Sequence, residues 1–391
     1  MPDVILVTGA SGFIGARLTR RLTRDRGERV TGFVHRLGTA GAARLATLPG
    51  VRLAHGDVGD GSILDEAMRG CEAVVHCAVD VSSAPSVQEQ VNARATRAVI
   101  DAARKNAVRH IVFLSTAAVH SWKRPGVVTE DAPVYGHDTY TRSKLEAEAL
   151  FLGNNEIPVT VIRPTCVYGP FGRTFTVTPI TFLRLGIPLV ASDNPGRANL
   201  IYVDNLVDLI LSALDRRPSA NRVYLAAEEE PAEWETLYSA YARTIGVPLA
   251  RYSSAGSRAQ MFREEISVSL SNARQLARHV ASDIKGPLLR GLATYHRHVP
   301  LLQRCDRFVP MGALRKAAGA ARSSGAKDAA PSASPPQNGV RAFAPRELRE
   351  FYSAKATFSA DRARRELGWA PRVTAAEALD RTCAWISFAG I

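Results

Sequence analysis

The stretch Val4-Ile5-Leu6-Val7-Thr8-Gly9-Ala10-Ser11-Gly12-Phe13-Ile14-Gly15 decides the fold of this chain. Its four leading apolar residues, mostly β-branched, are typical of a buried parallel strand. Gly9 would let the chain turn sharply off this strand, Gly12 would let backbone approach a pyrophosphate, and Gly15 would let helix and strand pack closely. The free N–H groups of the following helix favour an anion. We therefore expect a phosphate cradle, the alternative being a glycine-rich turn without a ligand.

Strand-like and helix-like segments alternate after this turn. Strands are expected near 30–34, 51–58, 74–78, 111–116 and 159–164, and helices near 13–24, 62–69, 87–106 and 140–152. This alternation predicts an α/β fold: a Rossmann-type doubly wound parallel sheet with a smaller, interleaved α/β C-terminal substrate domain. Residues 120–138 are expected to form a loop. After 169–170 the pattern loosens, and 251–315 is expected to hold mixed helix.

The domain boundaries follow from this pattern. Residues 1–168 plus about 198–224 are expected to form the dinucleotide-binding domain, and 169–197 plus 225–391 the substrate-binding domain. Residues 317–340 are rich in Ala, Ser, Pro and Gly and are expected to be a disordered linker.

Composition narrows the functional class. The chain has 391 residues, of which 46% are hydrophobic, and its net charge is +13. Because the arginines are scattered, we read this charge as that of a basic proteome and expect no nucleic-acid ligand. Five dispersed cysteines without a CxxC pair or Cys/His cluster favour reduced thiols, a cytoplasmic location and no metal site. No signal peptide or membrane-spanning run is expected.

Tyr140 and Lys144 lie one helical turn apart on an expected helix. A free phenol has a pKa of about 10, which a nearby ammonium lowers. Tyr140 could then exchange a proton with a substrate hydroxyl while hydride moves, and a hydroxyl at the end of the strand 111–116 could polarise the same oxygen. YxxxK alone is common on helix surfaces, so the prediction depends on its place after the glycine turn.

The end of the second strand would lie beside the adenosine ribose. It carries His35 and Arg36 and no carboxylate, which favours a 2′-phosphate and hence NADP, although NAD stays open. Asp57, which ends the third strand, could accept a hydrogen bond from adenine or cap the helix that follows.

Taken together, these features resemble the extended short-chain dehydrogenase/reductases, in particular the NAD(P)-dependent epimerase/dehydratase family. The segments that carry the resemblance run in the family's order over 4–225 and 350–388. They are Thr8–Gly15, Gly56-Asp57-Val58, Asn92, Leu114-Ser115-Thr116, Tyr140–Lys144, Arg163–Pro170, Ile201–Asn205 and Glu366–Pro371.

The resemblance implies roles for individual residues. Thr116, Tyr140 and Lys144 match the catalytic triad, with Ser115 as the fallback for Thr116. The cofactor contacts that complete the prediction, beside His35 and Arg36 at the end of the second strand, are Gly9, Gly12, Phe13, Ile14 and Gly15 at the pyrophosphate, Asp57 and Val58 at adenine, Cys77 and Ala78 under the ribose, Tyr140 and Lys144, and Pro164 and Val167 beside the nicotinamide.

Departures from the family pattern narrow the substrate. Ala117 and Ala118 stand where dehydratases carry Asp-Glu, which argues against elimination of water. Ala198 and Asn199 stand where sugar-nucleotide epimerases tend to carry an Arg-Asp pair, with Arg197 one residue early. The segment 196–205 looks more like the 3β-hydroxysteroid dehydrogenase-like and dihydroflavonol reductase-like branches, which act on apolar molecules.

The leading expectation is therefore an NAD(P)-dependent oxidoreductase that transfers hydride to or from a carbinol/ketone carbon of a small, apolar substrate. The alternatives are a nucleotide-sugar epimerase that retains NAD and a non-catalytic NAD(P)-sensing protein. We expect a small-molecule substrate, and leave open a homodimer and a peripheral membrane contact through 286–315, where apolar and basic residues alternate.

Overall fold

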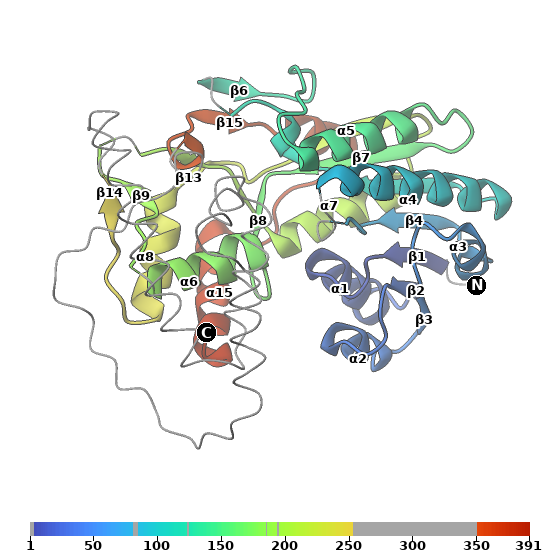
Figure 1. Cartoon of the computed structure of the whole chain (residues 1–391), viewed down its shortest axis with the longest axis horizontal. Helices are drawn as coiled ribbons and strands as arrows, with labels where there is room; N and C mark the ends of the chain where they lie inside the picture. The colour runs from blue at the N-terminus through green and yellow to red at the C-terminus, as the bar shows by residue number, and fades with distance from the viewer. Residues whose placement is uncertain (1–3, 81–84, 123–124, 185, 194, 253–349) are drawn as a thin grey trace. The chain divides into compact units, whose positions relative to one another are not determined.

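The computed structural model describes residues 4–80, 85–122, 125–184, 186–193, 195–252 and 350–391 (Figure 1). These residues divide into two compact units. Unit 1 comprises residues up to 176, 197–232 and 354–385, and unit 2 comprises the described residues of 177–196, 233–353 and 386–391. Every residue predicted to bind cofactor or to act in catalysis lies in unit 1.

Unit 1 is built on a seven-stranded parallel sheet with the strand order β12-β7-β5-β4-β1-β2-β3. The strands are β1 (Val4–Thr8), β2 (Arg29–Val34), β3 (Val51–His55), β4 (Ala73–His76), β5 (His110–Leu114), β7 (Val159–Pro164) and β12 (Arg222–Ala226). The order reverses direction at β1 and β4, which is where open parallel sheets bind their ligands. The predicted Rossmann-type doubly wound sheet is confirmed.

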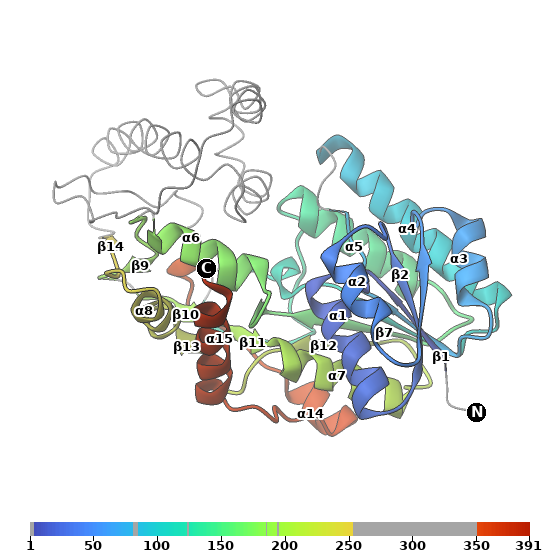
Figure 2. The same ribbon diagram turned by 90° about the horizontal axis from the view of Figure 1, so that it is seen from below.

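Helices cover both faces of this sheet (Figures 1 and 2). They are α1 (Phe13–Arg20), α2 (Ala40–Ala46), α3 (Gly61–Met68), α4 (Pro85–Lys105), α5 (Thr139–Leu152), α7 (Val203–Arg216) and α14 (Asp361–Leu367). The last helix, α15 (Ala375–Ala389), does not belong to these layers, and the boundary between the two units falls within it. Alternate residues of β1 face opposite layers: Val7 joins the core formed with α1 and α7, and Leu6 joins the core formed with α3, α4 and α5. Because both faces of β1 are buried, its residues 4–7 are all apolar instead of alternating with polar ones.

Shorter elements complete the described structure. They are η1 (Arg21–Asp25), η2 (Ala117–Val119), η3 (Arg173–Val177), α6 (Thr178–Arg184), α8 (Trp234–Thr244), β6 (Gly126–Val128), β8 (Cys166–Tyr168), β9 (Val190–Ala191), β10 (Arg197–Ala198), β11 (Leu200–Tyr202), β13 (Ala232–Glu233), β14 (Arg251–Tyr252) and β15 (Ala356–Phe358). In unit 2, β9 pairs with β14, and Trp234, Tyr238 and Tyr352 form an aromatic cluster in which the two tyrosine hydroxyls bond at 2.9 Å.

The C-terminal tail is tied to the sheet layer by Asn205. Its side-chain oxygen accepts hydrogen bonds from the backbone of Arg372 (3.1 Å) and Val373 (3.0 Å), and its carbonyl accepts one from the Trp369 indole (3.1 Å). These contacts, and the pairing of β15 with β6, explain why 354–385 belongs to unit 1, whereas the sequence pattern assigned this segment to the substrate domain.

Two expectations differ from the structure or fall outside it. The segment 120–138 is not only a loop, because Gly126–Val128 forms β6 and pairs in parallel with Ala356–Phe358. A partner more than two hundred residues away leaves no local signal. Of the predicted mixed helix at 251–315, Arg251 and Tyr252 form a strand, and the rest, with the proposed membrane segment 286–315 and the linker 317–340, lies outside the described residues.

Candidate active site

The glycine turn has the geometry that the sequence predicts. Gly9 has φ of +67°, which disfavours side chains, and a Cβ placed there would lie 2.9 Å from the Ala78 backbone nitrogen. A Cβ on Gly15 would lie 2.3 Å from the Gly9 carbonyl oxygen. Gly12 precedes α1 and offers no side-chain cap, so the first N–H groups of the helix stay available to an anion. These features fit a dinucleotide pyrophosphate.

The floor of this turn is fixed by Thr8 and His76, at the ends of β1 and β4. The Thr8 hydroxyl lies 2.7 Å from Nδ1 of His76 and accepts a hydrogen bond from the Ala78 backbone (3.2 Å). Burial, and then the charge of Lys144, lower the pKa of His76 to about 3, so the ring that is hydrogen-bonded to the Thr8 hydroxyl is neutral. Burial raises the pKa of Cys77 to about 12, so its side chain is a thiol.

Tyr140 and Lys144 are positioned by the first turns of α5. Asp138 and Thr141 form a capping box, with the Asp138 carboxylate accepting from the Thr141 backbone at 2.7 Å. Lys144 is buried, donates to the Leu114 carbonyl at 2.6 Å and stands 4.9 Å from the centre of the Phe113 ring. Burial lowers the pKa of Lys144 to about 8. The helix thus places a cation at the carboxyl end of β5.

The side chain of Thr116 lies beside the Tyr140 phenol and acts on the pKa of that phenol as a hydrogen-bonding group. Burial raises the pKa of Tyr140, the bond to Thr116 lowers it, and the charge of Asp138 raises it. The expected lowering of this pKa by Lys144 is not among these causes. The structure brings together the phenol and a hydroxyl that ends β5, in the arrangement needed to share one substrate oxygen.

The structure also separates Thr116 from the alternative, Ser115. The Ser115 hydroxyl donates to the Glu148 carboxylate on the next turn of α5 after Lys144. Thr116 caps η2 by accepting from the Ala118 backbone at 3.1 Å and reaches Tyr140. Of the two hydroxyls, only that of Thr116 is placed beside the phenol.

A buried polar network under this site was not predicted from the sequence. Arg163 of β7 binds the Glu148 carboxylate with two bonds, of 3.0 and 2.5 Å, and lies 3.0 Å from Nε2 of His120. The side chains of Arg163 and Glu148 are only 7% and 4% exposed. A charged residue within the apolar run 159–164, and a glutamate four residues after Lys144, are the signals that could have revealed it. We call Ser115, His120, Glu148 and Arg163 the Glu148 network.

The predicted adenosine contacts lie near the ends of β2 and β3. The Asp57 carboxylate accepts from the Gly59 backbone (2.8 Å) and pairs with Arg94 of α4 (2.9 Å), and more than half of its side chain is exposed. It does not cap α3, because Asp60 does so by accepting from Ser62 and Ile63. Val58 is partly buried, and His35 and Arg36 are exposed.

The remaining predicted contacts follow strands β4 and β7. Asn92 accepts from the Asp80 backbone at 2.8 Å and so holds the segment that follows Cys77 and Ala78. Pro164 ends β7, and Val167 lies in β8, which pairs in parallel with β11. No group of three or more His, Cys, Asp or Glu side chains in the described parts of the chain is placed to hold a metal ion. Among the helices that the structure describes, none is both long and apolar enough to cross a lipid bilayer.

Comparison with known proteins decides the family. A model of the NAD dependent epimerase/dehydratase family matches residues 5–227, more than half of the chain. The chain belongs to this family. It is an enzyme of the extended short-chain dehydrogenase/reductase type, acting as an NAD(P)-dependent oxidoreductase or epimerase.

Several proteins are similar to this family member. A UDP-glucose 4-epimerase from Vibrio cholerae is 29% identical over 247 residues, which cover 58% of this chain and 71% of that protein. A 2-alkyl-3-oxoalkanoate reductase from Stenotrophomonas maltophilia is 27% identical over 258 residues, covering 62% and 76%. The crystal structure of a UDP-glucuronic acid 4-epimerase from Bacillus cereus in complex with NAD has a TM-score of 0.65 at 17% identity over 99% of both chains, which shows that the fold is shared.

Proposed function

We propose that this enzyme epimerises a carbinol carbon of a nucleotide sugar by reversible hydride transfer, with Thr116, Tyr140 and Lys144 as its catalytic residues. The observation that carries the proposal is the position of the Tyr140 phenol, which lies beside the Thr116 side chain and one helical turn from the buried Lys144. These groups lie at the carboxyl ends of the strands, in the same unit as the glycine turn.

The cofactor that these residues fit is a nicotinamide dinucleotide. Its pyrophosphate would be held by Gly9, Gly12, Phe13, Ile14 and Gly15, its ribose by Cys77 and Ala78, and its nicotinamide by Pro164 and Val167. When bound, it would supply the hydride acceptor and donor. The tight approach of Gly15 to the Gly9 carbonyl and the uncapped start of α1 support this placement.

Each catalytic residue has a separate task. Burial keeps Tyr140 a neutral phenol at neutral pH, so its hydroxyl can protonate a substrate carbonyl oxygen. Removal of a carbinol proton needs the phenolate, which a nearby ammonium favours in general. In this structure Lys144 is not among the groups that shift the pKa of Tyr140. Thr116 donates to the same substrate oxygen and keeps it within reach of Tyr140. Epimerisation uses this set twice, once to take the proton and once to return it.

Two features of the chain bear on the net reaction. Ala117 and Ala118, in η2 directly after Thr116, offer no acid or base for elimination, which disfavours a dehydratase. The similarity to a UDP-glucose 4-epimerase supports epimerisation. An intact set of Thr116, Tyr140 and Lys144 argues against a non-catalytic sensor.

The second candidate is a net oxidoreductase acting on an apolar ketone or alcohol. It is favoured by Asn199, whose amide donates to the Ala356 carbonyl (2.9 Å) and accepts from the Phe358 backbone (3.0 Å). An amide engaged in this way is not available to a sugar diphosphate. The similarity to a 2-alkyl-3-oxoalkanoate reductase agrees with this candidate.

Release of cofactor from the purified enzyme distinguishes the two. An epimerase should retain about one nicotinamide dinucleotide per chain, and should interconvert UDP-glucose and UDP-galactose with no net change in absorbance at the reduced cofactor's band. Stoichiometric consumption of added cofactor, with no epimerised sugar, would overturn the proposal in favour of the oxidoreductase.

A separate proposal concerns the choice between NAD and NADP. His35 and Arg36 are exposed just beyond β2, and neither position carries the carboxylate that would repel a 2′-phosphate. We propose that the two side chains bind that phosphate, so that the enzyme accepts NADP as well as NAD.

A further inference from the structure

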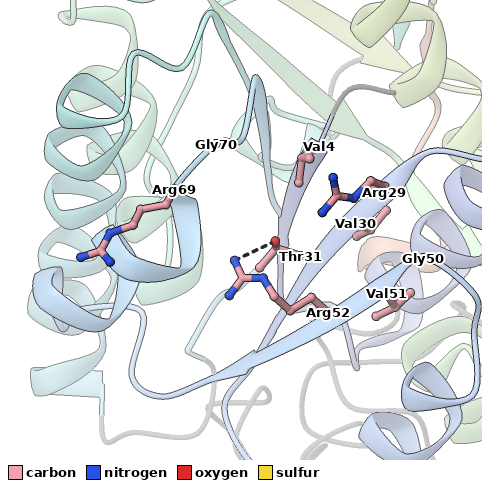
Figure 3. Close-up of a pocket in the computed structure, with 9 residues that line it drawn as sticks. All are labelled: Val4, Arg29, Val30, Thr31, Gly50, Val51, Arg52, Arg69 and Gly70. Atoms are coloured by element: carbon pink, nitrogen blue, oxygen red, sulfur yellow. Dashed lines mark hydrogen bonds between the residues drawn. The ribbon is translucent and has the colours of Figure 1, made fainter. Parts of the chain in front are cut away.

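A groove lies at the edge of the sheet opposite to the glycine turn (Figure 3). Its volume is about 390 Å³, within the range of sites for small ligands. It is lined by the first residues of β1, β2 and β3 and by the loops that contain Gly50 and Gly70. None of its nine lining residues is acidic, and three are arginines, namely Arg29, Arg52 and Arg69.

The charges of these arginines are not neutralised by the described residues. Arg52 donates to the Thr31 hydroxyl (3.1 Å) and the Ala67 carbonyl (2.8 Å), which hold its guanidinium in place without cancelling its charge. Arg29 and Arg69 are exposed, and their side chains make no ion pair or hydrogen bond with a described residue. In Figure 3 the guanidinium groups of Arg29 and Arg52 point into the same space, while that of Arg69 is turned away from it.

Three arginines elsewhere in the same unit are paired with aspartates. Along α1, η1 and the residue that follows η1, these arginines bind three aspartates of α7. The pairs are Arg17 with Asp204, Arg21 with Asp208, and Arg26 with Asp215. The arginines beside α7 are thus neutralised by aspartates, whereas those that line the groove face no acidic residue among its lining. The unneutralised arginines concentrate positive potential in a concave surface.

We propose that this groove binds a phosphate-bearing small molecule, with Arg29 and Arg52 as its two main contacts. A guanidinium donates two parallel hydrogen bonds to phosphate oxygens, and its charge strengthens both. Thr31, which accepts a hydrogen bond from Arg52, and Arg69, whose guanidinium is turned away, complete the polar part of the lining. We name the groove the arginine groove.

The arginine groove is independent of the proposed dinucleotide site. Val4, which lines the groove, begins β1, and Thr8, which precedes the glycine turn, ends it. At about 3.3 Å per residue, the four steps from Val4 to Thr8 separate the two sites by roughly 13 Å. Occupation of one site therefore leaves the other sterically open, and the two can be titrated separately.

The test is calorimetric titration of inorganic pyrophosphate into the full chain saturated with NAD. The Arg29→Gln/Arg52→Gln double variant should weaken pyrophosphate binding about a hundredfold, or about tenfold for each arginine. The matched control is Arg20→Gln/Arg24→Gln, which removes two exposed arginines of α1 and η1 and should leave binding unchanged. Equal binding by wild type and the first double variant, or no binding by wild type, would overturn the proposal.

A single variant and two further ligands distinguish this proposal from its alternatives. Arg29→Gln alone removes no contact with a described residue, so its expected tenfold loss cannot come from misfolding. Vesicles containing phosphatidic acid distinguish a lipid headgroup from a free phosphate: retention that pyrophosphate displaces would identify the headgroup as the source. Retention on double-stranded DNA that the first double variant abolishes, with no binding of pyrophosphate, would replace the small-molecule proposal.

Discussion

The two ends of the candidate site are built differently. At the catalytic end, Lys144, Glu148 and Arg163 are each less than a tenth exposed, and their polar groups bond to one another or to backbone. At the adenosine end, His35 and Arg36 are exposed, and Asp57 pairs with the equally exposed Arg94. Buried charged groups lose their hydration, so protein groups have to supply the hydrogen bonds that water would otherwise make. Exposed groups keep water as a partner.

This difference predicts a gradient of mutational effects. Substitutions at the catalytic end should cost large factors in turnover or stability. Substitutions at the adenosine end should change cofactor preference by small factors and leave stability nearly intact. Each experiment below tests one step of that gradient.

The largest effect is expected for Tyr140→Phe. Loss of the phenolic hydroxyl should lower kcat by roughly 10²- to 10⁴-fold, because proton transfer to the substrate oxygen is lost. Cofactor affinity should stay unchanged, since the ring remains in place. Tyr135→Phe removes an exposed hydroxyl and serves as the control. Unchanged turnover of the Tyr140 variant would refute the catalytic assignment.

The next effect concerns the Glu148 network. Arg163→Met leaves the Glu148 carboxylate buried without its bidentate partner, which should lower the free energy of unfolding by about 3–5 kcal/mol. The control is Arg142→Met on the same helix as Glu148, which breaks an exposed pair with Glu89 and should cost about 0–1 kcal/mol. Urea denaturation measures both. Similar losses in the two variants would contradict the contrast between buried and exposed pairs.

The pH dependence of stability should report the neutral, buried ring of His76. Its pKa is lowered from 6.5 to about 3, so between these values the unfolded chain binds a proton that the folded chain does not. The contribution of His76 to the free energy of unfolding should therefore fall as pH falls from 6.5 to 3. His76→Gln should flatten the curve over this window, and the exposed His55→Gln should not. Parallel curves for wild type and the His76 variant would show that the ring is not held neutral.

A smaller effect is expected at the glycine turn, between the two ends. In Gly15→Ala the new Cβ would lie 2.3 Å from a backbone oxygen, so the turn has to shift, at a cost of about 1–3 kcal/mol. Cofactor affinity should fall as well. Gly61→Ala, whose Cβ meets nothing within 4 Å, should be neutral or stabilising by about 0.4–1 kcal/mol. A Gly15 variant with wild-type stability and affinity would show that the close approach is not needed.

The sequence predicted local features of the site well and distant partners poorly. The turn at Gly9, the helical spacing of Tyr140 and Lys144 and the alternation of strands and helices along the chain follow from spacing and periodicity, which are local properties. The bonds of Arg163 to Glu148 and His120 join three separate segments, and only folding reveals which groups meet. The hydrogen bond of Ser115 to Glu148, which favours Thr116 over Ser115 as the catalytic hydroxyl, is likewise visible only in the fold. The raised pKa of Tyr140 also depends on burial that spacing does not report.

The smallest effect is expected at the exposed end, where His35→Ala/Arg36→Ala tests the cofactor preference. If these side chains bind a 2′-phosphate, the double variant should weaken NADPH by about tenfold and leave NADH nearly unchanged, since one exposed charge–phosphate contact is worth about 1.4 kcal/mol or less. Stability should not change, because both residues are exposed. Fluorescence titration with both cofactors measures the ratio. Equal weakening of NADH and NADPH would instead assign the two side chains to a part of the cofactor that both forms share. The adenosine end would then contribute to cofactor binding as a whole and not only to the choice between the two forms.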